Sequence, residues 1–143
     1  MATLLVTGGA GYIGSHTAVA PLEAGHDVVS LDNYSNSSPR ALERVQRIAG
    51  RPLAAVEGDV RDPQLLAALF SRHAFDGVIH FAALKAVGES VAKPLEYYAN
   101  NVGGTIALLQ AMQAARVRRL VFSSSATVYG APDALPIAED API

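Results

Sequence analysis

The sequence predicts an α/β protein built on a doubly wound parallel sheet. Three observations support this prediction. Short apolar runs rich in β-branched residues recur along the chain, longer segments of helical period separate them, and three glycines follow the first run directly. Strands that alternate with helices pair in parallel, because each helix returns the chain to the same edge of the sheet.

Five apolar runs are bounded by glycines or polar turn residues and are apolar on both faces, which is typical of strands buried in a parallel sheet. They are TLLVT (residues 3–7), DVVSL (27–31), LAAVEG (53–58), GVIHFA (77–82) and RLVFSS (119–124). Right-handed crossovers between them predict the spatial order 3-2-1-4-5, with the strands numbered along the chain.

Helices are predicted between these runs, at roughly residues 12–25, 39–49, 62–72 and 94–115. We expect the last helix to turn four apolar side chains inward, namely Ile106, Leu108, Leu109 and Met112. The proline-rich residues 131–143 are expected to form a loop.

Pro21 departs from this pattern, because it falls inside the first predicted helix. A proline in a helix interior removes one backbone N–H bond and clashes with the carbonyl four residues earlier, here that of Thr17. We expect a cost of ~3 kcal/mol or a kink.

Size and charge indicate one domain, over residues 1–143, that acts on small molecules. Half of the 143 residues are hydrophobic, which is enough for one core and too little for two ordinary domains. A net charge of −2 offers no basic stripe for nucleic acid, and no polybasic or long apolar segment suits a membrane. We therefore expect a cytoplasmic protein. The absence of cysteine excludes disulfides and thiolate metal sites.

Three glycines between the first strand and the first helix are suited to holding a dinucleotide. Gly8 permits a tight turn, Gly11 lets a pyrophosphate approach the backbone, and Gly14 lets the helix pack close to the sheet. The helix N-terminus then supplies free N–H donors. A glycine-rich turn without a ligand has the same spacing, but the position between strand and helix favours a Rossmann-type cofactor site.

Asp32 ends the second strand, 18 residues after Gly14. A carboxylate at this point is placed to accept hydrogen bonds from the adenosine ribose hydroxyls. It would repel a 2′-phosphate, and no arginine follows before Arg40, so NAD is favoured over NADP. The alternative is that Asp32 only forms a turn together with Asn33.

The third and fourth strands also end in residues suited to a ligand. Asp59 and Val60 are placed to hold an adenine edge, and small residues followed by Lys85 end the fourth strand. In the alternative interpretation Asp59 only caps a turn. His80 is interpreted as a packed strand residue rather than a ligand, because the histidines at positions 16, 26, 73 and 80 lack metal-site spacing. We predict no metal.

Five stretches together resemble one family. They are VTGGAGYIGSH (6–16), LDN (31–33), EGDVRD (57–62), VIHFAALKAVGESVAKPLEYYANNVGGT (78–105) and VFSSSATVYG (121–130). They resemble the extended short-chain dehydrogenase/reductase family, and within it the nucleotide-sugar 4-epimerases. The likeness covers essentially all 143 residues.

The resemblance implies a bound NAD that takes a hydride from C4 of a hexose and returns it to the other face, as in the interconversion of UDP-glucose and UDP-galactose in galactose metabolism. It implies cofactor contacts from Gly8, Gly11, Tyr12, Ile13, Gly14, Asp32, Asn33, Tyr34, Ser35, Asn36, Ser37, Asp59, Val60, Phe81, Ala82, Ala83, Leu84, Lys85 and Asn100. Ser125 matches the catalytic serine that binds the C4 oxygen, and Lys85 is expected near both cofactor and substrate. A homodimer of the complete protein is also implied.

One part of the family pattern is missing. The family's general base is the tyrosine of a Tyr-x-x-x-Lys pair, and Tyr129 does not fit because Asp133 stands four residues later. We therefore expect these residues to be the N-terminal portion of an epimerase, with a sheet incomplete on its C-terminal side, without the substrate domain and inactive alone.

Three other interpretations remain open. A related 4-epimerase acting on a uronic acid or a pentose is a near variant. A non-catalytic dinucleotide-binding module would explain the missing tyrosine, although the intact serine loop argues against it. A structural interaction fragment is supported only by the open edge of the sheet.

Overall fold

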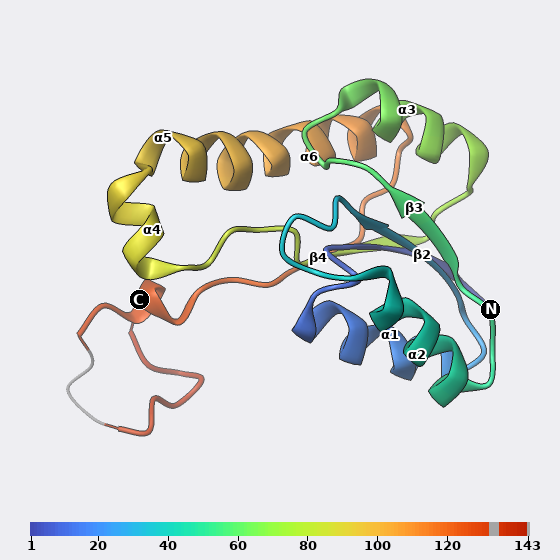
Figure 1. The fold of residues 1–143 in the computed structure, drawn as a ribbon, viewed down its shortest axis with the longest axis horizontal. Coiled ribbons are helices and arrows are strands. Elements are labelled where there is room, and N and C mark those ends of the chain that lie inside the picture. Colours follow the sequence, from blue (N-terminus) through green and yellow to red (C-terminus); the bar gives the residue numbers. More distant parts are fainter. Residues whose placement is uncertain (132–134, 143) are drawn as a thin grey trace.

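The computed structural model describes residues 1–131 and 135–142, and within them it has a five-stranded parallel sheet. The strands are β1 (Thr3–Thr7), β2 (Asp27–Asp32), β3 (Ala54–Glu57), β4 (Gly77–His80) and β5 (Leu120–Phe122). Their order is β3-β2-β1-β4-β5, so the predicted fold class and strand order are confirmed. The sheet is twisted, with β1 between β2 and β4 (Figure 1).

Helices cover both faces of the sheet (Figure 1). On one face, α1 (Tyr12–Glu23) and α2 (Pro39–Ala49) pack against a core that includes Val6, Val28 and Leu22. On the other face lie α3 (Pro63–Arg72) and α6 (Gly104–Ala114), over the larger core. That core consists of Leu5, Val29, Leu31, Val60, Leu66, Leu69, Phe70, Phe75, Val78, Leu108 and Met112.

Local sequence explains where α2 and α3 begin. The side chains of Ser38 and Asp62 accept hydrogen bonds from the first backbone N–H groups of these helices, and Pro39 and Pro63 take the first helical positions. The predicted range 39–49 is confirmed, and the predicted range 62–72 is confirmed apart from its first residue, which is the cap.

The fourth predicted helix is three consecutive elements. They are α5 (Pro94–Tyr97), the π-helical turn η1 (Tyr98–Gly103) and α6. The prediction that Ile106 and Leu109 face inward is wrong, because these side chains are 50% and 45% exposed. Leu108 and Met112, one turn apart, are buried against the sheet as predicted.

The edge strands differ from the prediction that every strand is buried on both faces. Most of β3 is exposed, and in β5 Val121 and Phe122 are 62% and 53% exposed. β5 is an edge strand with a partner on one side only, and its consecutive side chains Val121 and Phe122 point to opposite faces of the sheet, so the described helices leave both faces of β5 partly uncovered. Two short helices were not predicted, α4 (Val87–Ala92) and the 3₁₀ turn η2 (Ala126–Tyr129). Of the predicted C-terminal loop, residues 132–134 and 143 lie outside the described residues.

Pro21 lies within α1, and the helix continues past it to Glu23. The backbone N–H of Ala24 still donates to the carbonyl of Ala20, at 2.9 Å. The helix therefore accommodates the proline in its last turn, but the carbonyl of Thr17 loses its helical donor because proline has no N–H.

Replacing Pro21 with leucine should raise the free energy of unfolding by ~1–3 kcal/mol, since it restores one helical hydrogen bond and removes a steric clash. The measurement is the midpoint of urea denaturation. The matched control is Pro39→Leu, which should bring no gain, because the first residue of a helix has no use for its N–H. An unchanged or lower midpoint for Pro21→Leu would contradict the prediction.

Candidate functional site

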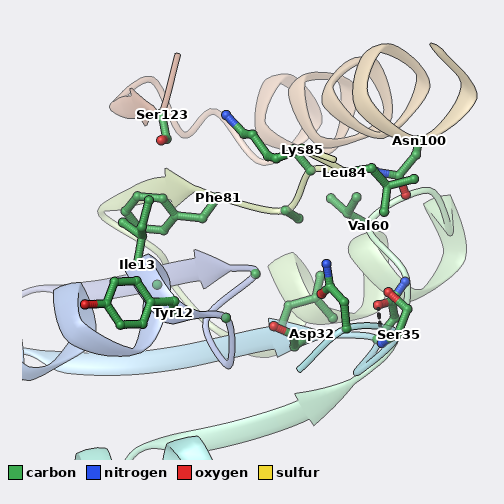
Figure 2. A pocket seen from close by; sticks show the side chains of 18 of the residues that line it. Tyr12, Ile13, Asp32, Ser35, Val60, Phe81, Leu84, Lys85, Asn100 and Ser123 are labelled. Atoms are coloured by element: carbon green, nitrogen blue, oxygen red, sulfur yellow. Dashed lines mark hydrogen bonds between the residues drawn. The ribbon is translucent and has the colours of Figure 1, made fainter. Parts of the chain in front are cut away.

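The carboxyl ends of the parallel strands surround a cavity of about 520 Å³. Its wall is formed by the loop from β1 to α1 with the first turn of α1, the end of β2, the segments that follow β2, β3, β4 and β5, and one residue of η1. Figure 2 shows the labelled side chains around an open centre, with Ser123 and Lys85 toward one end and Val60, Asn100 and Asp32 toward the other. Ligands of doubly wound folds bind at this edge of the sheet.

The cavity brings together most of the residues that the sequence selected as cofactor contacts. They are Gly8, Gly11, Tyr12, Ile13, Gly14, Asp32, Asn33, Ser35, Asn36, Asp59, Val60, Phe81, Ala82, Ala83, Leu84, Lys85 and Asn100. Tyr34 and Ser37 do not line it, although the backbone N–H of Tyr34 and the hydroxyl of Ser37 both donate to Asp32.

Sequence reasoning missed five residues of the lining, namely Leu31, Gly58, Ala86, Ser123 and Ser124. Each is adjacent in sequence to a selected residue or belongs to the VFSSS stretch. Position near the end of a strand would have found these residues. Where a strand leaves the sheet, consecutive residues can all border the cavity, whichever face of the sheet they would point to within the strand.

Glycine is required where the β1–α1 loop meets its neighbours. Gly8 has a φ of +66°, and a Cβ there would lie 2.7 Å from the backbone nitrogen of Ala82. A Cβ on Gly14 would overlap the carbonyl oxygen of Gly8. No side chain among the described residues caps the N-terminus of α1, and the first residues of α1, Tyr12 to Gly14, line the cavity, so the first N–H groups of the helix are suited as donors for an anion.

Asp32 is 7% exposed and holds two loops together. One carboxylate oxygen accepts from the backbone N–H of Ala10, at 2.9 Å, and the other from the N–H of Tyr34 and the hydroxyl of Ser37. A carboxylate has about four acceptor positions, so one remains on the oxygen that Ala10 contacts. Asp32 therefore forms a local turn, as in the alternative interpretation of the sequence, and it can still accept a hydrogen bond from a ribose hydroxyl.

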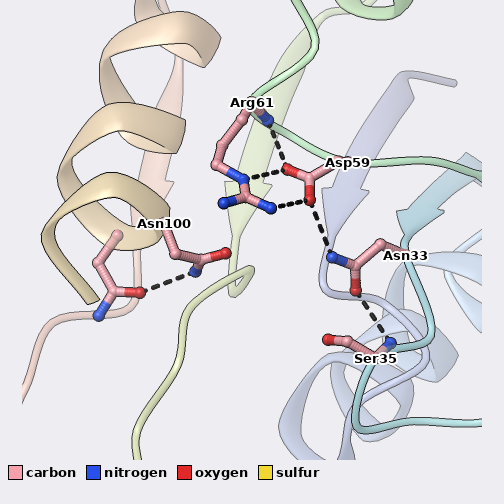
Figure 3. Close-up of polar contacts among 6 residues, drawn as sticks. Asn33, Ser35, Asp59, Arg61 and Asn100 are labelled. Atoms are coloured by element: carbon pink, nitrogen blue, oxygen red, sulfur yellow. Dashed lines mark hydrogen bonds and ion pairs between the residues drawn. The ribbon is translucent and has the colours of Figure 1, made fainter. Parts of the chain in front are cut away.

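Asp59 is the centre of a second polar cluster (Figure 3). The guanidinium of Arg61 donates to both carboxylate oxygens, at 2.8 and 2.7 Å, and the side-chain amide of Asn33 donates to one of them, at 3.1 Å. The Arg61 hydrogen bonds hold the pKa of Asp59 well below its usual range. The cluster joins the segment after β2 to the segment after β3, and it pairs the charge of Arg61 with that of Asp59.

A second cavity, of about 350 Å³, adjoins the first. The two share the segment 81–85 together with Ser123 and Ser124. Ser125 and Lys85, the residues that sequence analysis assigned to the substrate, both line the second cavity. The hydroxyl oxygen of Ser125 accepts from the backbone N–H of Thr127, at 3.3 Å, so it begins the η2 turn.

His80 is 3% exposed and lies between two hydroxyls, those of Thr7 and Thr105. Burial, and to a lesser degree the charge of Lys85, lowers the pKa of its imidazole.

Within residues 1–131 and 135–142 no three histidine, cysteine or acidic side chains gather as a metal site. In the same residues no helix has the length and apolar character needed to cross a membrane.

The sheet, the glycine turn and the cavity at the carboxyl edge together define the doubly wound class of α/β protein. The sequence profile of the NAD dependent epimerase/dehydratase family matches residues 4–143. The chain belongs to this family.

Two of its curated relatives are named UDP-glucose 4-epimerase. The Haemophilus influenzae protein is 59% identical over 137 residues, which are 96% of this chain and 40% of that protein. A Klebsiella pneumoniae sequence is 55% identical over 136 residues, which are 95% of this chain and 98% of that sequence. The chain thus spans about two fifths of the length of the Haemophilus protein.

Among solved structures, the chain is similar to the UDP-glucose 4-epimerase of Bifidobacterium longum, which was determined in complex with NAD+ and UDP. The TM-score is 0.94 at 57% identity, over 98% of this chain and 42% of the other. The chain is also similar to the Stenotrophomonas maltophila enzyme with bound NAD and formylated UDP-arabinopyranose, with a TM-score of 0.93 at 54% identity, over 99% of this chain and 42% of that one.

The Asp59–Arg61 pair should make stability depend on pH on the acid side. Because the folded-state pKa of Asp59 is lowered, the pair stabilises the protein above pH ~4 and this contribution is lost as the pH falls through the folded-state pKa. Arg61→Met should therefore lower the urea midpoint slightly near neutral pH and flatten its fall below pH ~4. The effect is small, because solvent screens the half-exposed guanidinium.

The control is Arg44→Met, since Arg44 is an exposed arginine of α2 with no ion pair among the described residues. Its midpoints should follow those of the wild type at every pH. Equal pH slopes for Arg61→Met and the wild type would show that the pair contributes nothing to the acid transition.

Proposed function

We propose that this chain is the NAD-binding portion of an enzyme that interconverts UDP-glucose and UDP-galactose. The observation that carries the proposal is the pair of adjoining cavities. One is lined by the glycine turn and the strand-end carboxylates, and the other by Ser125 and Lys85, with the segment 81–85 as their common wall. The relatives described above, named UDP-glucose 4-epimerase, support the same assignment.

In the first cavity the chain's own groups suit each part of a dinucleotide. The free N–H groups at the start of α1 suit the pyrophosphate, and the remaining acceptor position of Asp32 suits a ribose hydroxyl. Asp59 and Val60 then line the end suited to adenine. NAD, when bound, supplies the acceptor for a hydride from C4 of the sugar and returns that hydride to the opposite face.

In the second cavity Ser125 and Lys85 are suited to the sugar. The Ser125 hydroxyl accepts from the N–H of Thr127 and lies 2.9 Å from the Thr127 hydroxyl. When the Thr127 hydroxyl donates to it, the Ser125 proton is directed to another partner, such as the C4 oxygen. The ammonium of Lys85 places a positive charge where both cavities meet, which favours an anionic ligand. The Ser125 hydroxyl is a weak base near neutral pH and needs an adjacent general base to be activated.

A homodimer of the complete protein and a cytoplasmic location remain proposals. The exposed apolar side chains of Val102, Ile106 and Leu109 on one side of the η1–α6 helix, and of Val121 and Phe122 on β5, support an interface. A non-catalytic dinucleotide-binding module is the second candidate function, because the glycine turn and Asp32 of the first cavity suit a dinucleotide without any group from the second cavity.

Asp32→Ala should weaken the preference for NAD over NADP by removing the charge that repels a 2′-phosphate. The measurement is the ratio of the two dissociation constants by calorimetry. The control is Asp27→Ala, at the exposed amino end of the same strand, which should leave the ratio unchanged. Equal binding of both dinucleotides by the wild type would remove the basis of the prediction.

The 143-residue chain alone should not convert UDP-galactose to UDP-glucose. The chain alone should lack two contributions to the rate. General-base assistance is worth ~10²–10⁴ in rate, and holding the sugar in place is worth ~7–11 kcal/mol of barrier reduction. The comparison is a chimera in which the remaining C-terminal part of the Haemophilus influenzae relative follows this chain. The chimera should be active and its Ser125→Ala variant strongly impaired. Comparable turnover by the chain alone would make Tyr129 the candidate base, and a chimera that binds NAD without turnover would favour the non-catalytic module.

A further inference from the structure

The segment 81–85 leaves the sheet after β4 and forms the wall between the two cavities. Its backbone belongs to no helix or strand. The N–H of Phe81 still donates to the backbone carbonyl of Thr7, at 3.0 Å, and the residues after it need other partners. We propose that Asn101, supported by Thr105 and His80, is a positioning residue that fixes this wall and thereby the shape of the cofactor cavity. The inference rests on the proposed function, because the cavity matters only if it binds NAD.

Asn101 pairs with both backbone groups of one residue in the wall. Its side-chain oxygen accepts from the N–H of Leu84, at 2.8 Å, and its side-chain nitrogen donates to the carbonyl of Leu84, at 2.9 Å. These two bonds determine which end of the amide is which, since the reversed amide would satisfy neither. The side chain thus replaces the strand partner that the segment lacks.

The π-helical turn η1 directs two consecutive asparagines to the two cavities. Asn100 lines the first cavity and Asn101 the second. The side-chain amide of Asn100 donates to the side-chain oxygen of Asn101, at 2.9 Å, and this bond is drawn in Figure 3. Short π-helical turns are frequent at functional sites. Here η1 presents Asn100 to the cofactor cavity while Asn101 holds the wall.

A chain of hydrogen bonds connects Asn101 to the other end of the wall. The hydroxyl of Thr105 donates to the carbonyl of Asn101, at 2.6 Å, so it must accept from Nε2–H of His80, at 3.1 Å. Nδ1 of His80 is then unprotonated and accepts from the hydroxyl of Thr7, at 2.6 Å. The oxygen of Thr7 in turn lies 3.4 Å from the backbone N–H of Ala82.

The network holds the wall at two points, Ala82 and Leu84, and requires a neutral imidazole at His80. A protonated His80 would have two N–H donors, and the hydroxyl of Thr7 would have to reverse its direction. Burial favours the neutral form, since it lowers the pKa of His80. The wall is therefore ordered before any ligand binds, so less conformational entropy is lost on binding.

The test compares the wild type with Asn101→Ala by two measurements. Hydrogen exchange of the Leu84 amide, measured without NAD, should become at least about tenfold faster, because its acceptor is lost. The dissociation constant for NAD by calorimetry should rise about tenfold. The amide of Leu108, in the buried part of α6, should stay protected and shows that the fold is intact.

Gln113→Ala is the matched control, since Gln113 is an exposed amide side chain on α6 that lines neither cavity. Both measurements should equal those of the wild type.

A second variant, Thr105→Val, serves if Asn101→Ala fails to fold. Valine has nearly the same shape as threonine but removes the link between His80 and Asn101. It should therefore also speed the exchange of the Leu84 amide and raise the dissociation constant for NAD. Unchanged Leu84 exchange, or faster exchange with unchanged NAD affinity, would overturn the inference. A wild type that binds no NAD would overturn the proposed function and the cofactor part of this inference. The Leu84 exchange would still test whether the two hydrogen bonds from Asn101 hold the wall.

Discussion

The close approach of two backbones, at Gly8 and Ala82, is the constraint on which the rest of the site depends. A Cβ at Gly8 would lie 2.7 Å from the nitrogen of Ala82, so the β1–α1 loop and the segment after β4 can meet only where the side chain is absent. This contact brings the N-terminus of α1 to the carboxyl edge of the sheet. It also presses the segment 81–85 against the loop, which makes that segment the wall of both cavities.

Polar side chains at the strand ends organise the loops around the cavity. Asp32 ties the glycine loop to the segment after β2 through Ala10, Tyr34 and Ser37. Asp59, held by Arg61 and Asn33, ties that segment to the one after β3. A carboxylate has about four acceptor positions. Asp32 uses three of them for local turns and keeps one toward the ligand space, whereas the bonds from Arg61 and Asn33 fill all four of Asp59. The structural and the functional interpretations are therefore compatible for Asp32, and Asp59 borders the ligand space as a structural residue.

Local sequence was sufficient for the strand order, the helices α2 and α3, and the glycines and charged residues at the strand ends of the first cavity, while the family resemblance supplied the other predicted lining residues. The reason is that parallel strands bring their carboxyl ends to one edge, so residues just after each apolar run are brought together whatever the details of the loops. The same reasoning failed for Ile106 and Leu109, because apolar composition cannot tell which side of a helix has a partner. It failed for the edge strand β5 for the same reason.

By itself, the sequence determined the glycine turn, the strand order and the residue types at the strand ends, because these depend on backbone sterics and periodicity along the chain. Only the tertiary structure decided the direction of each side chain and the partners that it meets. Arg61 neutralises Asp59 beside the segment after β2, and Asn101 reaches back 17 residues to Leu84. Such contacts join segments that are distant in sequence, and their geometry is set by how helices and strands pack, so no local pattern encodes them.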